Sequence, residues 1–135
     1  MHISETIPSQ LKLIPLLISS VVEKLCQLPL DKETISGVKL VLQEALINAV
    51  KHGNKMNSGL LVQVDIVFKP EQLTIQVTDQ GEGYDYKNIP DPTEPQNLEK
   101  LKGRGIFLIK HAMDKVEFEN KGRTIIMIKY LNKED

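Results

Sequence analysis

The feature that most constrains the fold of this chain is a change of hydrophobic period near its middle. Residues 29–54 carry apolar side chains at helical spacing, whereas residues 59–79 alternate apolar and polar side chains, as half-buried strands do. Residues 9–28 also follow the helical spacing, and residues 69–72 have the length of a hairpin turn between two strands. Because each period occupies its own stretch of chain, we expect helices that pack on a sheet.

Signals for helix ends accompany the helical stretches. Ser9 suits the N-cap of the first helix, and Pro15 favours either a later start or a kink, because proline has no amide N–H to donate. Asp31 suits the N-cap of the second helix, and Gly53 suits its end. The buried face of the first helix is expected to be formed by its apolar residues Leu13, Leu16, Leu17, Val21 and Leu25.

The remaining segments add one helix and three strands. Residues 1–8 alternate weakly and predict an edge strand, and residues 105–113 predict a short apolar helix. Residues 115–120 and 123–131 predict a closing pair of strands.

The order of elements defines the expected fold class. Residues 84–103 contain many polar groups and several prolines, which indicates a long loop of the kind that is often functional. The resulting order β–α–α–β–β–loop–α–β–β predicts an α+β fold, a two-layer α/β sandwich with helices on one face of a mixed, mainly antiparallel sheet. It lacks the strict βαβ alternation of a doubly wound fold. We expect residues 1–135 to form a single domain.

Charge and composition narrow the function classes. The chain has 17 Lys and Arg against 18 Asp and Glu, so its net charge of -1 gives no bulk attraction to nucleic acid. No apolar run approaches the ~18 residues that a membrane helix needs, and the N-terminus lacks the pattern of a secretion signal. We therefore expect a cytoplasmic protein that binds neither nucleic acid nor a membrane directly. Cys26 is the single cysteine, which excludes an intramolecular disulfide, and its apolar helical surroundings predict a buried side chain.

The first candidate site is the stretch EALINAVKHGN. Glu44 and Asn48 lie four residues apart in it, so they share one face of a helix. An amide oxygen suits Mg²⁺, which prefers oxygen ligands and retains waters or phosphate oxygens for the rest of its coordination. A carboxylate one turn away can accept a proton from a nucleophile. The alternative interpretation is a helix surface with two solvated polar residues.

The second candidate site is the stretch DQGEG, which follows a predicted strand. Asp79 at the strand end can accept a hydrogen bond from an exocyclic amine, such as that of adenine. Gly81 and Gly83 carry no side chains, so a planar base could approach the backbone. An acidic turn without a ligand is the alternative interpretation of this short motif.

The third candidate site is the stretch KGRGIFLI. Gly103 and Gly105 lie where a helix is expected to begin, and helix N-termini bind phosphate through free amide groups. Lys102 and Arg104 add positive charge there. The spacing is not that of a P-loop, and no strand leads into it as in a Rossmann turn. The alternative is an ordinary joint between a loop and a helix. Taken in order, the three stretches supply a metal ligand, a base-recognition carboxylate and a phosphate cradle.

These motifs resemble the N, G1 and G2 boxes of the GHKL ATPases, which have the Bergerat, histidine-kinase-like ATPase fold. The stretches EALINAVKHGN, DQGEGYD and GRGIFLIKHAMDKVEF resemble the bacterial anti-sigma-factor serine/threonine kinases in particular. The resemblance extends over residues 9–130. No phosphoacceptor histidine and no dimerisation hairpin precede the N box, which argues against a histidine kinase.

The resemblance implies a role for each matching residue. Asn48 would coordinate Mg²⁺, and Glu44 would be the general base toward a serine or threonine of a partner protein. Asp79 would bind the adenine amine with support from Thr124, and residues 84–102 would form an ATP lid. The residues implied to bind the nucleotide are Asn48, Asp79, Gly81, Gly83, Lys102, Gly103, Arg104, Gly105 and Thr124.

The implied activity is an ATP- and Mg²⁺-dependent serine/threonine protein kinase. Its implied substrate is a small anti-sigma-factor antagonist, and its second candidate partner is a sigma factor that the kinase sequesters. The resemblance is also compatible with a homodimer. One alternative function is a non-catalytic module whose bound nucleotide sets its affinity for a partner. Another is an interaction domain with a degenerate pocket, which the intact boxes disfavour.

Overall fold

The computed structural model of the chain describes residues 1–83 and 101–131, without the side chains of residues 101–104. Within these residues the strands form one sheet in the order β1-β2-β3-β5-β4, and each neighbouring pair is antiparallel. The strands are β1 (His2–Pro8), β2 (Leu61–Lys69), β3 (Gln72–Thr78), β4 (Lys115–Glu119) and β5 (Thr124–Tyr130). The sheet expected from the sequence is confirmed, with β1 at one edge, but among the described residues it is wholly antiparallel and not mixed.

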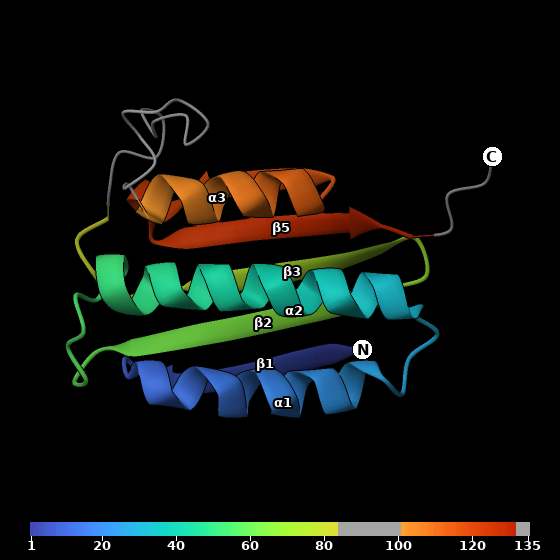
Figure 1. Cartoon of the computed structure of the whole chain (residues 1–135), viewed down its shortest axis with the longest axis horizontal. Helices are drawn as coiled ribbons and strands as arrows, with labels where there is room; N and C mark the ends of the chain where they lie inside the picture. The colour runs from blue at the N-terminus through green and yellow to red at the C-terminus, as the bar shows by residue number, and fades with distance from the viewer. Residues whose placement is uncertain (84–100, 132–135) are drawn as a thin grey trace.

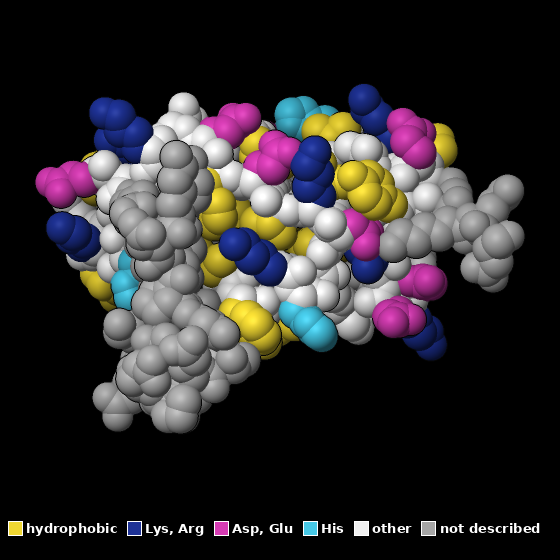
Figure 2. All heavy atoms as spheres, turned by 90° about the horizontal axis from the view of Figure 1, so that it is seen from above, with side chains coloured by type: hydrophobic (Ala, Val, Ile, Leu, Met, Phe, Trp, Pro, Cys, Tyr) yellow, Lys and Arg dark blue, Asp and Glu magenta, His cyan; other side chains and the backbone are white. Residues whose placement is uncertain are grey.

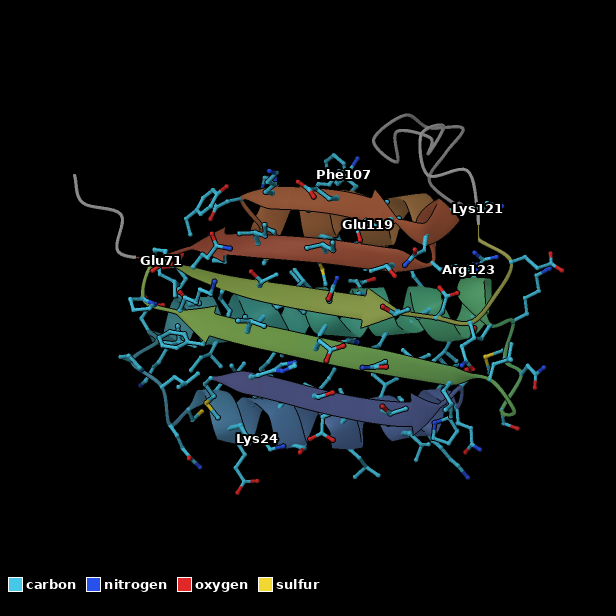
Figure 3. All side chains as sticks on the ribbon, turned by 180° about the vertical axis from the view of Figure 1, so that it is seen from behind. Lys24, Glu71, Phe107, Glu119, Lys121 and Arg123 are labelled. Atoms are coloured by element: carbon cyan, nitrogen blue, oxygen red, sulfur yellow. The ribbon has the colours of Figure 1, made fainter. Side chains whose placement is uncertain are left out.

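The helices cover one face of this sheet. The longer ones are α1 (Ile14–Leu25), α2 (Lys32–Ile47) and α3 (Leu101–Ala112), and they lie side by side in Figure 1. Figure 3 shows the opposite face of the sheet, which these helices leave open. The two-layer α+β sandwich predicted from the order of elements is therefore confirmed.

The core lies between the two layers. Alternate residues of the central strands point toward the helices, so Val62, Val64 and Ile66 of β2 are fully buried. Buried side chains of α2, among them Leu42 and Leu46, belong to the same core cluster as these valines and isoleucine. Burying a side chain of this size stabilises the fold by about 1.5–3 kcal/mol. The change of period in the sequence thus corresponds to the two faces of one core.

Three of the predicted helix boundaries are correct. Asp31 is the N-cap of α2, and its Oδ1 accepts a hydrogen bond of 2.7 Å from the Thr34 amide. Pro15 lies in the first turn of α1, so the helix begins late, at Ile14. The helix α2 continues into the short helix η2 (Asn48–Gly53), which ends at Gly53 as predicted.

The prediction for Ser9 is wrong. Its side chain does not cap a helix but lies buried beyond β1, where its Oγ donates to the Leu60 carbonyl oxygen at 2.7 Å. The first helical turn, η1 (Leu11–Leu13), begins after Gln10 and has no side-chain cap.

The buried face of α1 also differs from the prediction. Its buried residues are Ile14, Leu17, Val21 and Leu25. Leu13 precedes the helix and is half-buried, Leu16 is 68% exposed, and Cys26 is exposed. Successive residues of a helix are rotated by about 100°. Leu16 and Cys26 each neighbour a buried residue and therefore point away from the core, so the predicted burial of Cys26 is wrong.

The loop predicted at residues 84–103 lies largely outside the described residues. Its last three positions belong to α3, so the predicted end of the loop is wrong. Among the described helices, none is both long and apolar enough to span a bilayer. Figure 2 views the molecule from the side of α3, and acidic and basic side chains are interspersed there among hydrophobic ones.

Candidate functional site

Two cavities at one end of α2 share the side chain of Asn48. The wider one has a volume of about 420 Å³, and its lining includes Glu44, Asn48 and Gly105. The narrower one has a volume of about 20 Å³, and its lining includes Asn48, Asp79 and Arg123. The structure therefore brings the first two candidate sites together at one residue, and Gly105 of the third candidate site joins them.

Gly105 allows α3 to approach the polar face of α2. A Cβ atom added at Gly105 would lie 3.0 Å from Glu44 Oε2 and 3.4 Å from Asn48 Nδ2. Contacts of 3.0–3.4 Å are tighter than nearly all real Cβ contacts, so a larger residue would press on both side chains. The prediction that Glu44 and Asn48 share one face is confirmed, and that face points at α3.

A π-helical turn, η2 (Asn48–Gly53), continues α2 at this point. The Asn54 amide donates to the Ala49 carbonyl oxygen at 2.7 Å, which is the i→i+5 bond that defines such a turn. Lys51 and His52, three and four residues after Asn48, line the wider cavity with it. Lys51 thus adds a positive charge to this cavity, which would favour a bound anion.

The DQGEG loop has a fixed backbone. The amide of Asp79 donates to the Arg123 carbonyl oxygen at 2.9 Å, and the amide of Gln80 donates to Asn54 Oδ1 at 2.8 Å. The amide of Gly81 donates to the carboxylate of Asp79 itself at 2.9 Å. The Asp79 side chain is only 7% exposed and lines the narrower cavity, as its predicted role requires.

Glycines let this loop pack tightly against the end of η2. A Cβ at Gly81 would overlap the carbonyl group of Gly53, and a Cβ at Gly53 would overlap the Asp79 carboxylate. Gly83 has φ of +86°, a conformation that strains most other residues, and it packs on the Lys121 carbonyl oxygen. The predicted need for glycine at positions 81 and 83 therefore has a structural cause even without a bound base.

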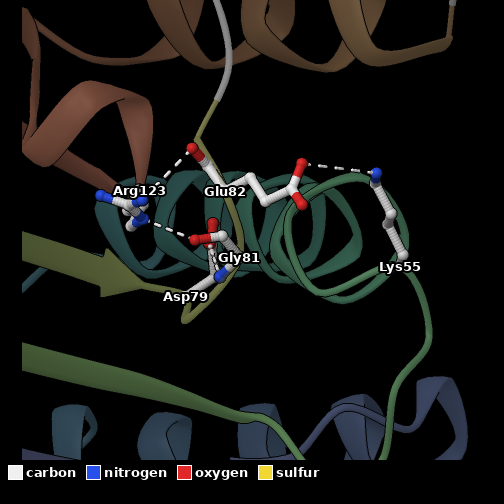
Figure 4. A network of polar contacts seen from close by, with 5 residues as sticks. All are labelled: Lys55, Asp79, Gly81, Glu82 and Arg123. Atoms are coloured by element: carbon white, nitrogen blue, oxygen red, sulfur yellow. Dashed lines mark hydrogen bonds and ion pairs between the residues drawn. The ribbon is translucent and has the colours of Figure 1, made fainter.

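Arg123 holds the far end of the same loop. Its guanidinium group donates to the carbonyl oxygens of Gly81 and Glu82, as Figure 4 shows. On the other side of the loop, Lys55 Nζ lies 4.0 Å from Glu82 Oε2, an exposed pair that contributes little to stability. In Figure 3, Arg123 and Lys121 lie together at one end of the sheet, and Glu71 lies at the other end.

Thr124 lies beside Asp79 on the neighbouring strand. It is 2% exposed, and its Oγ1 lies 3.2 Å from Thr78 Oγ1 and 3.0 Å from Asn120 Nδ2. It therefore links β5 to the residue immediately before Asp79. Its predicted support of the adenine-binding carboxylate stays a prediction.

The third candidate site is only partly described. Gly103 and Gly105 both lie in α3, which begins at Leu101, so the helix starts four residues earlier than the predicted start at Gly105. The side chains of Lys102 and Arg104 lie outside the described residues, so their predicted contacts with phosphate stay predictions.

Sequence reasoning missed two polar residues that the structure places at this site. Lys51 follows Asn48 by three residues, and this spacing could have identified it. Arg123 has partners about 40 residues earlier in the chain, and no local pattern predicts such contacts.

Size alone does not identify the site. A cavity of about 460 Å³ lies at the opposite end of α2, where its lining includes Asp31, Gly37 and Lys129. We assign the site by chemistry instead, because the Asn48 cavities combine a carboxylate, an amide and a lysine opposite a glycine.

The donor set limits how a metal could bind. Among residues 1–83 and 101–131, no group of three or more His, Cys, Asp and Glu side chains could hold a metal ion. A protein cage of the kind that Ca²⁺ or Zn²⁺ uses is therefore not found in this part of the chain. The Asn48 amide oxygen and the nearby Glu44 carboxylate do fit Mg²⁺, which takes its remaining oxygens from water and phosphate.

Comparisons with known proteins agree with the geometry. Serine-protein kinase RsbW of Staphylococcus epidermidis is 36% identical over 110 residues, which cover 76% of this chain and 69% of that protein. The protein of the same name from Staphylococcus aureus strain JH9 is 32% identical with the same coverage. Residues 7–129 match the family described as histidine kinase-like ATPase domain. The predicted resemblance is thus confirmed, and the chain belongs to the histidine kinase-like ATPase domain family.

Proposed function

We propose that this chain is an ATP-binding serine/threonine protein kinase that phosphorylates a small anti-sigma-factor antagonist. By partner switching it would regulate a second protein, for which a sigma factor is the first candidate. The names of its relatives in two Staphylococcus species support the serine kinase activity. The observation that carries the proposal is the position of Asn48, which lines both the cavity of Asp79 and the cavity of Glu44. A nucleotide could therefore place its base at Asp79 and its phosphates near Glu44, with Asn48 between them.

The binding end of the proposed site is built around Asp79. Its carboxylate would accept a hydrogen bond from the exocyclic amine of adenine, which a neutral apolar wall could not do. The apolar residues Val77 and Ile125 line the same cavity and would contact the faces of the base. Adenine is larger than the 20 Å³ cavity, so we propose that its walls separate when nucleotide binds.

The reacting end is built around Asn48 and Glu44. Asn48 would supply one oxygen to Mg²⁺, and Lys51 would add charge that favours phosphate. Bound Mg²⁺ would neutralise the charge that develops on the phosphate oxygens. Glu44 would accept the proton of the substrate hydroxyl. The hydroxyl oxygen would form a bond to the γ-phosphorus of ATP, and the bond between that phosphorus and the leaving oxygen of ADP would break. The products would be ADP and a phosphorylated serine or threonine.

The nucleotide-sensing module remains the alternative function. It would use the same cavities, but it would have no need of Glu44 as a base. The proposal also keeps two sequence-based expectations, a cytoplasmic location and a homodimer.

Removing the proposed base tests the kinase directly. The chain and γ-labelled ATP are added to a protein extract of its own source cells, and labelled proteins are identified by mass spectrometry. We expect one small protein labelled on serine or threonine by the unaltered chain. With Glu44→Gln, ATP binding should be retained and labelling should slow by roughly 10²- to 10⁴-fold, the range of general acid–base catalysis.

Each failure has its own meaning. Equal labelling by Glu44→Gln would contradict the role of Glu44 while leaving the kinase in place. No labelled protein, despite ATP binding, would favour the nucleotide-sensing module.

A further inference from the structure

Asn54 is a buried asparagine that no part of the proposed mechanism uses. It follows η2 directly and is only 1% exposed. Its Nδ2 donates to Ser9 Oγ at 2.7 Å and to the Leu61 carbonyl oxygen at 3.0 Å. Its Oδ1 accepts the Gln80 amide at 2.8 Å. A buried polar side chain with both ends engaged holds the segments that it joins, because breaking any bond leaves a buried group without a partner.

The contacts of Asn54 close into a ring. Asn54 donates to the carbonyl oxygen of Leu61, the Leu61 amide donates to Gln80 Oε1 at 2.7 Å, and the Gln80 amide donates back to Asn54. Only the Asn54 amide both donates and accepts in this ring, so the ring depends on that one side chain. The ring joins the end of η2, the start of β2 and the DQGEG loop.

The ring lies next to Asp79 in the chain. The Asp79 amide is fixed on one side by the backbone of Arg123, and the following amide is fixed on the other side by Asn54. The two peptide groups that flank the Asp79 Cα are thus each held by one hydrogen bond. Gly53, the residue before Asn54, has the Asp79 carboxylate packed against its Cα. The end of η2 therefore contacts both the backbone of the DQGEG loop and the side chain of Asp79.

We propose that Asn54 is a positioning residue that sets the Asp79 carboxylate for the exocyclic amine of adenine. This proposal rests on the proposed function, in which Asp79 recognises that amine. Asn54 does not contact the base in this scheme; it acts through the Gln80 amide. Asparagine suits the role because it accepts from Gln80 and donates to Ser9 and Leu61 at once, which alanine cannot do.

The test compares two nucleotides that differ only in the amine. The dissociation constants of ATP and of purine riboside triphosphate, which lacks the 6-amino group, are measured at 25 °C by calorimetry. The ratio of the two constants reports recognition of the amine and cancels any uniform loss of affinity. A hydrogen bond to a charged group predicts a ratio of roughly 10 to 100 in favour of ATP for the unaltered chain. Asp79→Ala gives the ratio without the carboxylate.

Three variants separate positioning from simple stability. Asn54→Ala removes the bond to Gln80, and its ratio should fall toward that of Asp79→Ala. Asn54→Asp keeps an oxygen facing the Gln80 amide but loses both donors, so it should lower the melting temperature while its ratio stays above that of Asn54→Ala. Ser9→Ala removes a buried partner of Asn54 but keeps the bond to Gln80, so it should lower the melting temperature without changing the ratio. Should Asn54→Ala not fold, Asn54→Ser replaces it, because a serine hydroxyl is too short to reach Gln80.

The outcomes are distinct. An unchanged ratio in folded Asn54→Ala or Asn54→Ser would overturn the positioning role and leave the role of Asp79 intact. A fallen ratio in Ser9→Ala as well would also overturn it, since loss of stability would then explain every variant. An unaltered chain that binds both nucleotides equally would overturn the adenine recognition proposed for Asp79, and the role of Asn54 with it.

Discussion

At the scale of single residues, Gly105 decides how closely α3 can approach Glu44 and Asn48. Gly105→Ala would place a methyl group 3.0 Å from Glu44 Oε2, so both polar side chains would have to shift. We expect this variant to weaken ATP binding by roughly tenfold, the effect of about 1.4 kcal/mol. Calorimetric titration with Mg-ATP measures this change.

Gly37→Ala is the matched control for Gly105→Ala. It lies inside α2, and a Cβ added there would meet no atom within 4 Å. Alanine is a better helix former than glycine, so this variant should gain roughly 0.5–1 kcal/mol of unfolding free energy and bind ATP unchanged. Equal binding by Gly105→Ala and the unaltered chain would contradict the close approach.

Which site residues the sequence could predict depends on how local their partners are. Glu44 and Asn48 share a face because of helical spacing alone, so the sequence predicts them correctly. The Asn54 side chain bonds to residues 26 positions later and 45 positions earlier in the chain. Such contacts arise only when the sheet assembles, and no periodicity within a short window contains them.

At the scale of elements, the start of α2 depends on Asp31. Hydrogen bonding from Thr34 lowers the pKa of the Asp31 carboxyl below its ordinary value of 3.8. A lowered pKa in the folded state means that the charged cap stabilises the protein above the unfolded pKa, and that this contribution is lost as the pH falls through the folded value. The cap should therefore act fully at neutral pH and weaken only below about pH 4.

Two substitutions check the cap. Asp31→Ala should lower the melting temperature at pH 7, because the Thr34 amide loses its acceptor. Asp31→Asn keeps an acceptor but loses the charge that favours a helix N-terminus, so it should be intermediate. Thermal unfolding followed by circular dichroism from pH 7 to pH 2.5 measures both. A difference between Asp31→Asn and the unaltered chain that stays constant down to pH 2.5 would contradict the titration of Asp31.

The sequence predicts which segments form helices and strands better than it predicts which of their residues are buried. The alternation is strict in β3 and holds in β2 as far as Ile66, so the inward residues there follow from the sequence. The helix α1 is apolar on more than one side, so spacing alone did not separate buried Leu17 from exposed Leu16. The π-turn η2 could not be predicted either, because a wider turn leaves no mark in residue type.

At the scale of the whole molecule, the sheet order explains why the site lies where it does. The strands β3 and β5 are neighbours in the sheet although about 50 residues separate them in the chain. This pairing sets Thr124 opposite Thr78 and brings Arg123 to the DQGEG loop. In Figure 1 the helix α2 lies over β3, and Asn48, which follows the end of α2, lines one cavity with Asp79. The site is thus a product of the topology rather than of any one motif.

The measurement that tests the central claim most directly is calorimetric binding of Mg-ATP and Mg-ADP to the unaltered chain and to Asn48→Ala. Asn57→Ala, in the turn before β2, serves as a control for loss of an asparagine elsewhere. A ligand at 100 times its dissociation constant should also raise the unfolding free energy by about 2.7 kcal/mol. We predict that the unaltered chain and Asn57→Ala bind both nucleotides, and that Asn48→Ala loses the part of the affinity that depends on Mg²⁺. Equal, Mg²⁺-dependent binding by Asn48→Ala, or no binding by the unaltered chain, would contradict a nucleotide site centred on Asn48.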